Sequence, residues 1–227
     1  MLNSFYGKLR QQRQSINHNI MRLFLFVLIC SLFGCGHNVA EGHNAVLINS
    51  PVKIKELRKK ALSARIYCKQ HKMDTSVAIL IDMSIPSGLK RFVVWNFKKD
   101  TIVMKGMVSH GCGNKKWATD ESSKHPVFSN VMDSHCSALG KYKIGARGYS
   151  QWGIHVNYLL YGLEKTNSNA LARTIVLHSW NAIPDTETYP AGIAESWGCP
   201  AVPNDFMKAL DLILKAKNKP VLLWIYN

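Results

Sequence analysis

The feature that most constrains the fold is a series of short apolar segments, rich in β-branched residues and separated by turns. Such segments are typical of strands that are buried in a sheet. They do not alternate regularly with helical segments, which argues against a repeating strand–helix architecture. The pattern predicts a mainly β domain, a sandwich or partial barrel with a few helices, over residues 76–227. Its expected strands cover residues 77–81, 91–97, 101–108, 141–144, 153–161, 173–178 and 220–226.

Two segments have helical spacing instead. Residues 52–72 carry apolar side chains three or four positions apart among many lysines and arginines, which predicts a basic amphipathic helix. Together with the polar stretch before it, this helix forms an expected tether and helix over residues 36–75. Residues 205–216 predict the C-terminal helix of the domain, with Asn204 as its N-cap.

Residues 1–35 have the layout of an export signal. Residues 1–22 contain four basic side chains and no acidic one, and the 11-residue apolar run Leu23–Phe33 follows. As a helix this run would rise only about 16 Å, which is short of the ~30 Å hydrocarbon core of a bilayer. We therefore expect an exported protein of the periplasm or cell envelope. Met1 and Met21 are both candidates for the start of translation.

The end of the apolar run, Leu32-Phe33-Gly34-Cys35, resembles the cleavage box of bacterial lipoproteins. The resemblance implies a diacylglycerol on Cys35 and anchoring of the protein in a membrane. Phe33 departs from the small residue that is usual at its position. Simple secretion and an uncleaved anchor therefore stay open beside lipidation.

The chain is strongly basic, with 29 lysines and arginines against 14 acidic residues and a net charge of +15. Residues 1–35 contribute four of the positive charges, so the chain without them carries +11. A basic surface favours anionic partners such as anionic lipid or cell-wall polymer. Export and the lack of a nucleic-acid-binding motif argue against nucleic acid. Charge that serves only solubility is the simpler alternative.

The cysteines indicate one reactive thiol and leave disulfide pairing open. Cys30 lies in the apolar run and Cys35 is the lipidation candidate, so four cysteines remain in the domain and its helix: Cys68, Cys112, Cys136 and Cys199. None of the spacings is C-x-x-C, which argues against a zinc ribbon or a thioredoxin-type site. Cys112 and Cys136 bracket a long polar segment, where a disulfide would act as a staple. That segment, residues 111–135, is longer than most loops that only connect two elements, and it is therefore expected to cover a site.

Cys199 and His178 form the candidate catalytic pair. Gly198 before Cys199 permits a sharp turn and a close approach of substrate, and the apolar segment 173–178 ends in His178. A free thiol is only a few per cent thiolate at neutral pH, so a nearby imidazole would have to accept its proton. We expect a depressed pKa for Cys199, and the backbone amide of Cys199, helped by Gly198, as the oxyanion donor. A buried structural thiol and a hydrogen-bonded structural histidine are the alternatives.

A zinc site is a further alternative. His110, His135 and His178 would supply three nitrogen ligands for zinc, but the sequence lacks an H-E-x-x-H or similar motif. The sequence therefore predicts neither a metal nor any other cofactor.

Seven blocks of the sequence, in this order along the chain, resemble the murein L,D-transpeptidase catalytic-domain family. The blocks are Ala78–Pro86, Ser109–Gly111, Phe128–Asn130, Ser134–Tyr142, Gly162–Glu164, Ala172–His178 and Ser196–Pro203. The resemblance covers roughly residues 76–227. Departures lie close to the cysteine: Trp197 stands where many relatives have histidine, Ala201 where they have a basic residue or asparagine, and Glu195 where close relatives often have arginine.

The resemblance implies an enzyme that acts on the stem peptides of peptidoglycan. Cys199 would attack the amide before the terminal D-alanine of a tetrapeptide stem, with His178 as base and later acid. A second stem would then resolve the thioester into a 3–3 cross-link, without metal or ATP. His178 would be held by a backbone carbonyl through its other ring nitrogen. The implied oxyanion and substrate-binding residues are Ser196, Trp197, Gly198, His110 and His135.

Two further hypotheses stay open at this stage. Water could resolve the thioester, which would make the protein an L,D-carboxypeptidase or hydrolase with the same machinery. The domain could instead bind the cell wall without chemistry. The sequence gives no indication of oligomeric state.

Overall fold

The computed structural model describes residues 51–227, so the expected signal at residues 1–35 and most of the tether lie outside the described part of the chain. Within it, the strands form one eight-stranded sheet in the order β3-β2-β1-β8-β4-β5-β6-β7. The sheet is nearly closed, which confirms the prediction of a mainly β partial barrel. Its elements are α3 (Pro51–Gln70), β1 (Val77–Asp82), β2 (Phe92–Asn96), β3 (Thr101–Gly106), β4 (Gly140–Tyr149), β5 (Val156–Gly162), η1 (Lys165–Asn167), β6 (Val176–Ser179), β7 (Ala201–Val202), α4 (Asn204–Lys215) and β8 (Leu222–Tyr226).

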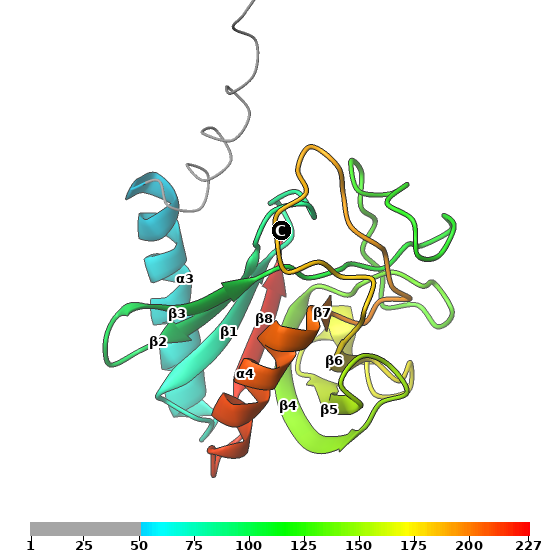
Figure 1. Cartoon of the computed structure of the whole chain (residues 1–227). Coiled ribbons are helices and arrows are strands. Elements are labelled where there is room, and N and C mark those ends of the chain that lie inside the picture. The colour runs from blue at the N-terminus through cyan, green and yellow to red at the C-terminus, as the bar shows by residue number, and fades with distance from the viewer. Residues whose placement is uncertain (1–50) are drawn as a thin grey trace, which may run out of the picture. The chain divides into compact units, whose positions relative to one another are not determined.

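The last strand of the chain joins the two halves of the sheet (Figure 1). β8 pairs in parallel with β1 on one side and antiparallel with β4 on the other. The remaining neighbours are antiparallel except for β6 and β7, which run in parallel. This last pairing matters for function, because it sets His178 of β6 beside Ala201 of β7, two residues after Cys199.

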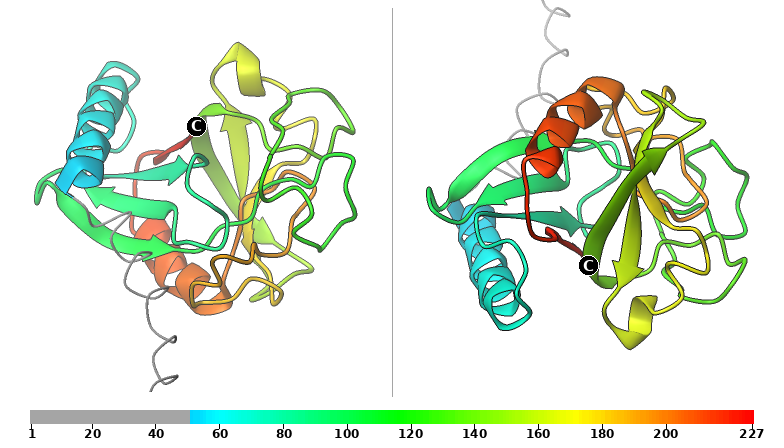
Figure 2. Two further views of the ribbon diagram at one scale, coloured as in Figure 1. Left: turned by 90° about the horizontal axis from the view of Figure 1, so that it is seen from above. Right: turned by 90° about the horizontal axis from the view of Figure 1, so that it is seen from below.

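The alternation of side chains along β1 explains why a helix lies on each face of its half of the sheet. Successive strand residues point to opposite faces. Ile79 and Ile81 pack in the main core, whereas Ala78 and Leu80 pack in a second cluster beneath α3. Figure 2 accordingly shows α3 and α4 on opposite sides of β1–β3.

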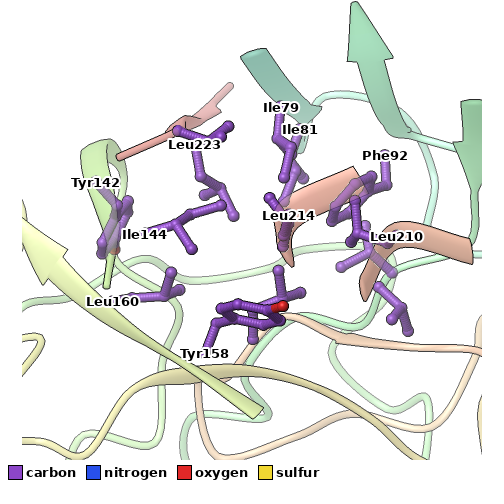
Figure 3. Close-up of a cluster of buried hydrophobic side chains, with 14 of the residues drawn as sticks. Ile79, Ile81, Phe92, Tyr142, Ile144, Tyr158, Leu160, Leu210, Leu214 and Leu223 are labelled. Carbon is purple, nitrogen blue, oxygen red and sulfur yellow. The ribbon is translucent and has the colours of Figure 1, made fainter. Parts of the chain in front are cut away.

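The main core lies inside the curved sheet and is covered by α4 (Figure 3). Three residues of one face of α4, Met207, Leu210 and Leu214, contact the inner side chains of the strands. Complete burial of each such side chain stabilises the fold by about 1.5–3 kcal/mol. The small residues Ala61 and Ala64 let α3 approach the opposite face closely.

The element boundaries differ from the expected ones where local backbone geometry intervenes. The expected strand 173–178 begins only at Val176, because Thr174 has a φ of +54° that a strand cannot contain. Asn204 is the first residue of α4 and not its N-cap, which is Pro203. The two-residue strand β7 was not expected. Within residues 51–227, the structure contains no helix that is both long enough and apolar enough to span a membrane.

Candidate active site

An open pocket of about 810 Å³ contains both predicted catalytic residues, Cys199 and His178. Strand β6 and the segment before it form one wall, and the turn that carries Cys199 forms another. The side chains that line the pocket come from Trp117, Tyr149, Ser150, Gln151, Trp152, Asn157, Arg173, Thr174, Val176, His178, Trp180, Ser196, Trp197 and Cys199. The structure thus brings together two residues that are far apart in sequence.

His178 is held in an orientation that suits a base. Its Nδ1 lies 2.9 Å from the carbonyl oxygen of Ser179, and because a carbonyl only accepts, Nδ1 carries the proton. Nε2 is then the unprotonated nitrogen. Burial lowers the pKa of His178, and the bond to Ser179 opposes this only in part. The imidazole is therefore neutral at pH 7. The backbone-carbonyl partner is the one that the family resemblance implied.

Cys199 lines the same pocket and contacts the start of β6. Its Sγ lies 3.4 Å from the backbone N of Val176 and 3.8 Å from the carbonyl oxygen of Thr174. Burial raises the pKa of the Cys199 thiol, while the Val176 amide and the Arg173 charge lower it less. The expectation of a depressed pKa for Cys199 is therefore wrong. Among the described residues, Sγ makes no hydrogen bond with the imidazole of His178, so the resting pair consists of two neutral groups.

The turn Ser196–Cys199 is fixed by its own hydrogen bonds. Ser196 Oγ accepts from the Gly198 amide at 3.1 Å and donates to the Cys199 carbonyl at 2.6 Å. Gly198 has a φ of +103°, and a Cβ there would lie 2.6 Å from the Cys136 carbonyl oxygen, so only glycine fits. The Gly198 amide is already engaged. The Cys199 amide has no acceptor in residues 51–227 and remains the candidate oxyanion donor.

Two buried serines that the sequence reasoning missed hold the same turn from outside. Ser109 Oγ donates to the Cys199 carbonyl at 3.2 Å and accepts from the Ala201 amide at 3.1 Å. Ser137 Oγ donates to the Gly198 carbonyl at 3.4 Å and accepts from the Gly111 amide at 3.0 Å. Both residues lie within blocks that resemble the family, and only this location in the sequence could have indicated their role.

Arg173 is anchored beside the pocket by two backbone carbonyls. It precedes β6, and its guanidinium donates to the Ser129 carbonyl at 2.9 Å and to the Cys136 carbonyl at 2.6 Å. These bonds connect the residue before β6 to two loop residues that lie about 40 positions earlier in the sequence. Arg173 also lines the pocket, where it is the only permanently charged side chain that residues 51–227 contribute. It is therefore a candidate binding residue for an anionic group of a substrate.

Of the two predicted binding histidines, His135 lies beside the site and His110 does not line it. His135 is exposed and stacks on Trp197, with ring centroids 5.1 Å apart. Trp197 is 58% exposed and lines the pocket.

His110 is a buried structural residue, so its expected contact with substrate does not fit. It lies 3.0 Å from the Arg91 guanidinium and 3.0 Å from Ser122 Oγ, and burial with the Arg91 charge lowers its pKa to about 3. Glu195 Oε1 lies 3.5 Å from its Nε2. Glu195 is fully buried and its Oε2 has no hydrogen-bond partner within the described residues, so burial raises the pKa of this carboxyl.

The remaining cysteines and the histidines form no metal site in the part of the chain that the structure describes. The thiols of Cys68, Cys112 and Cys136 are free and buried. The long segment 111–135 contributes Trp117 to the pocket. Trp117, Trp152 and Trp180 were missed by the sequence reasoning because their spacing in the chain carries no pattern.

The chain belongs to the L,D-transpeptidase catalytic-domain family, whose model matches residues 49–226. This match begins before residue 76, where the domain was expected to start. A search of the curated proteins finds no match.

The solved structures that the chain resembles at low identity include three proteins. These are the helical cell shape determining protein Pgp2 from Campylobacter jejuni (11% identity, TM-score 0.40, covering 67% of this chain and 48% of that one), the L,D-transpeptidase from Xylanimonas cellulosilytica (13%, 0.36, 66% and 60%) and the Enterococcus faecium L,D-transpeptidase (9%, 0.40, 66% and 50%). The chain therefore spans between 48% and 60% of the length of these chains.

Proposed function

We propose that the protein is a cysteine-dependent L,D-transpeptidase of the cell envelope that acts on the tetrapeptide stems of peptidoglycan. The observation that carries the proposal is the presence of Cys199, His178 and Arg173 on the walls of one pocket. Family membership supports the same reaction class. The expected export signal in residues 1–35 would deliver the enzyme to the compartment where this substrate lies, with or without a lipid on Cys35.

The first half of the reaction forms a thioester. Sγ of Cys199 attacks the carbonyl carbon between the third stem residue and the terminal D-alanine, and its proton passes to Nε2 of His178. The amide of Cys199 donates to the oxyanion that forms. His178 then returns the proton to the nitrogen of D-alanine, the C–N bond breaks, and D-alanine leaves. The neutral resting pair suits this order, because the proton moves only when the sulfur attacks.

The second half consumes the thioester. The side-chain amine of a second stem attacks the same carbonyl carbon, loses a proton to His178, and expels the Cys199 sulfur, which regains its proton. The product is a 3–3 cross-link. Arg173, which has no acidic partner among the pocket residues that the structure describes, would bind the carboxylate of a stem.

The test is an incubation of the purified protein with disaccharide–tetrapeptides, followed by mass spectrometry. Cross-linked dimers that have lost one D-alanine support the proposal. Tripeptide monomers alone would assign the hydrolase alternative instead. Unchanged turnover in Cys199→Ala would contradict a mechanism through Cys199, and Cys68→Ala is the matched control, since Cys68 lies in the cluster beneath α3.

A further inference from the structure

Four indole rings form a continuous aromatic surface along the proposed active-site pocket. This tryptophan wall consists of Trp117, Trp152, Trp180 and Trp197. Trp180 is its buried support: Trp117 stacks on it with centroids 5.2 Å apart and planes at 17°, and Trp152 meets it edge-on at 5.9 Å. Trp197 extends the wall from Trp117, with centroids 5.9 Å apart.

The wall leaves much of its aromatic surface open to solvent. Trp117 is 40% exposed, Trp152 38% and Trp197 58%. Contiguous exposed apolar surface of this kind marks binding sites in folded proteins. Among the described residues, no acidic side chain lines the pocket, and the amides of Gln151 and Asn157 lie on the same walls. Flat apolar faces beside neutral amides match a ligand with apolar faces and a rim of hydroxyls, which is the chemistry of a pyranose ring.

The wall is attached to both halves of the proposed catalytic machinery. Trp180 follows β6, two residues after His178, and Trp197 stands two residues before Cys199. From Trp197 the wall continues to Trp117 and on to Trp152 in steps of 5.9 and 6.0 Å. Three extended residues span about 10 Å. A sugar that carries the stem would therefore reach the wall while the bond after the third stem residue lies at Cys199.

We infer that the tryptophan wall binds the pyranose rings of the glycan strand to which the stem peptide is attached. The inference rests on the proposed function and adds to it that the enzyme recognises glycan-linked stems over free peptides. Trp197 and Trp117 are the stacking residues, and Trp180 is a positioning residue that supports Trp117.

The test measures binding without turnover. Full-length Cys199→Ala protein is titrated with disaccharide–tetrapeptide, free tetrapeptide and the disaccharide alone, with calorimetry for Kd and tryptophan fluorescence for contact with the wall. We expect the glycan-linked stem to bind about tenfold more tightly than the free tetrapeptide. A further Trp197→Ala change should weaken binding of the glycan-linked stem about tenfold more than binding of the free tetrapeptide, and Trp197→Phe should restore most of the difference. Trp224→Phe, whose ring lies under Lys60 and away from the pocket, should leave every Kd unchanged.

Three results would overturn the inference: equal Kd values for the two stems, an equal loss for both in Trp197→Ala, or no binding of either. These outcomes are separable from failure of the proposed function. If wild-type protein turns over stems while the two Kd values are equal, only the glycan inference fails. If wild-type protein is inert towards stems and forms no adduct at Cys199, the proposed reaction itself fails.

Discussion

The backbone amide of Val176, the first residue of β6, lies 3.4 Å from the Sγ of Cys199, and His178 on the same strand lines the same pocket. One short strand therefore contacts the proposed nucleophile and supplies the proposed base. β6 also pairs in parallel with β7, where His178 is opposite Ala201. Because Ala201 follows Cys199 by two residues, this pairing is a second link between the base and the nucleophile. The relative position of sulfur and imidazole thus depends on strand pairing together with the hydrogen-bonded turn that carries Cys199.

The pH dependence of catalysis should reflect the neutral imidazole. Burial lowers the pKa of His178, so the ring stays unprotonated and able to accept a proton below its ordinary pKa of about 6.5. The acidic limb of kcat/KM should therefore have an apparent pKa below 6.5, and His178→Gln should lower kcat by about 10²–10⁴-fold. A pH–rate profile with a limb above 6.5 would show that the base is a different group.

Arg173 should affect both the substrate and the sulfur. Its charge is one of the influences that lower the pKa of Cys199, so Arg173→Ala should move the pH dependence of Cys199 alkylation by iodoacetamide to higher pH. Loss of the carboxylate partner should reduce kcat/KM about ten- to a hundredfold. Arg65→Ala, on the exposed face of α3, is the matched control. An unchanged alkylation profile together with unchanged KM would leave Arg173 with a purely structural role.

Ser109 should be needed for both stability and the position of Cys199. Ser109→Ala removes the hydroxyl that donates to the Cys199 carbonyl and leaves the Ala201 amide without its acceptor. The free energy of unfolding should fall by about 1–3 kcal/mol in urea titrations. The alkylation rate of Cys199 should fall as well, whereas Ser63→Ala on the exposed side of α3 should change neither quantity. Loss of stability with a normal alkylation rate would argue that the turn keeps its geometry without Ser109.

Glu195 should destabilise the protein as the pH rises. Burial raises the pKa of this carboxyl above that of the unfolded chain, so the folded state binds more protons between the two pKa values. Stability is lost as the pH rises through this window, because the buried group must ionise. Glu195→Gln removes the ionisation, so its stability relative to wild type should increase from pH 4 to pH 7 in denaturant titrations. A difference that does not vary with pH would mean that Glu195 is already compensated in its ionised form.

The sequence allowed the main architecture to be predicted, because buried strands such as 77–81 and the helix near 205–216 have strong local patterns. The family blocks also indicated Cys199 and His178 as catalytic candidates, and both residues line the same pocket. Sequence reasoning did not predict the start of β6 at Val176, which depends on the positive φ of Thr174. Nor did it find the tryptophan wall, since Trp117 and Trp180 meet only through the folding of a long loop against β6. The expected substrate contact of His110 was wrong, because a sequence does not distinguish a buried structural histidine from one that binds substrate.

The central claim is that Cys199 forms a covalent thioester with the stem, and trapping that adduct tests it most directly. Wild-type protein is mixed with disaccharide–tetrapeptide, quenched in acid within one turnover, digested and analysed by mass spectrometry. The account predicts a peptide containing Cys199 that carries the disaccharide–tripeptide acyl group, that loses it in hydroxylamine, and that is absent in Cys199→Ala. Turnover of the stem with no acyl group on Cys199 at any quench time, or with the acyl group on another residue, would contradict it.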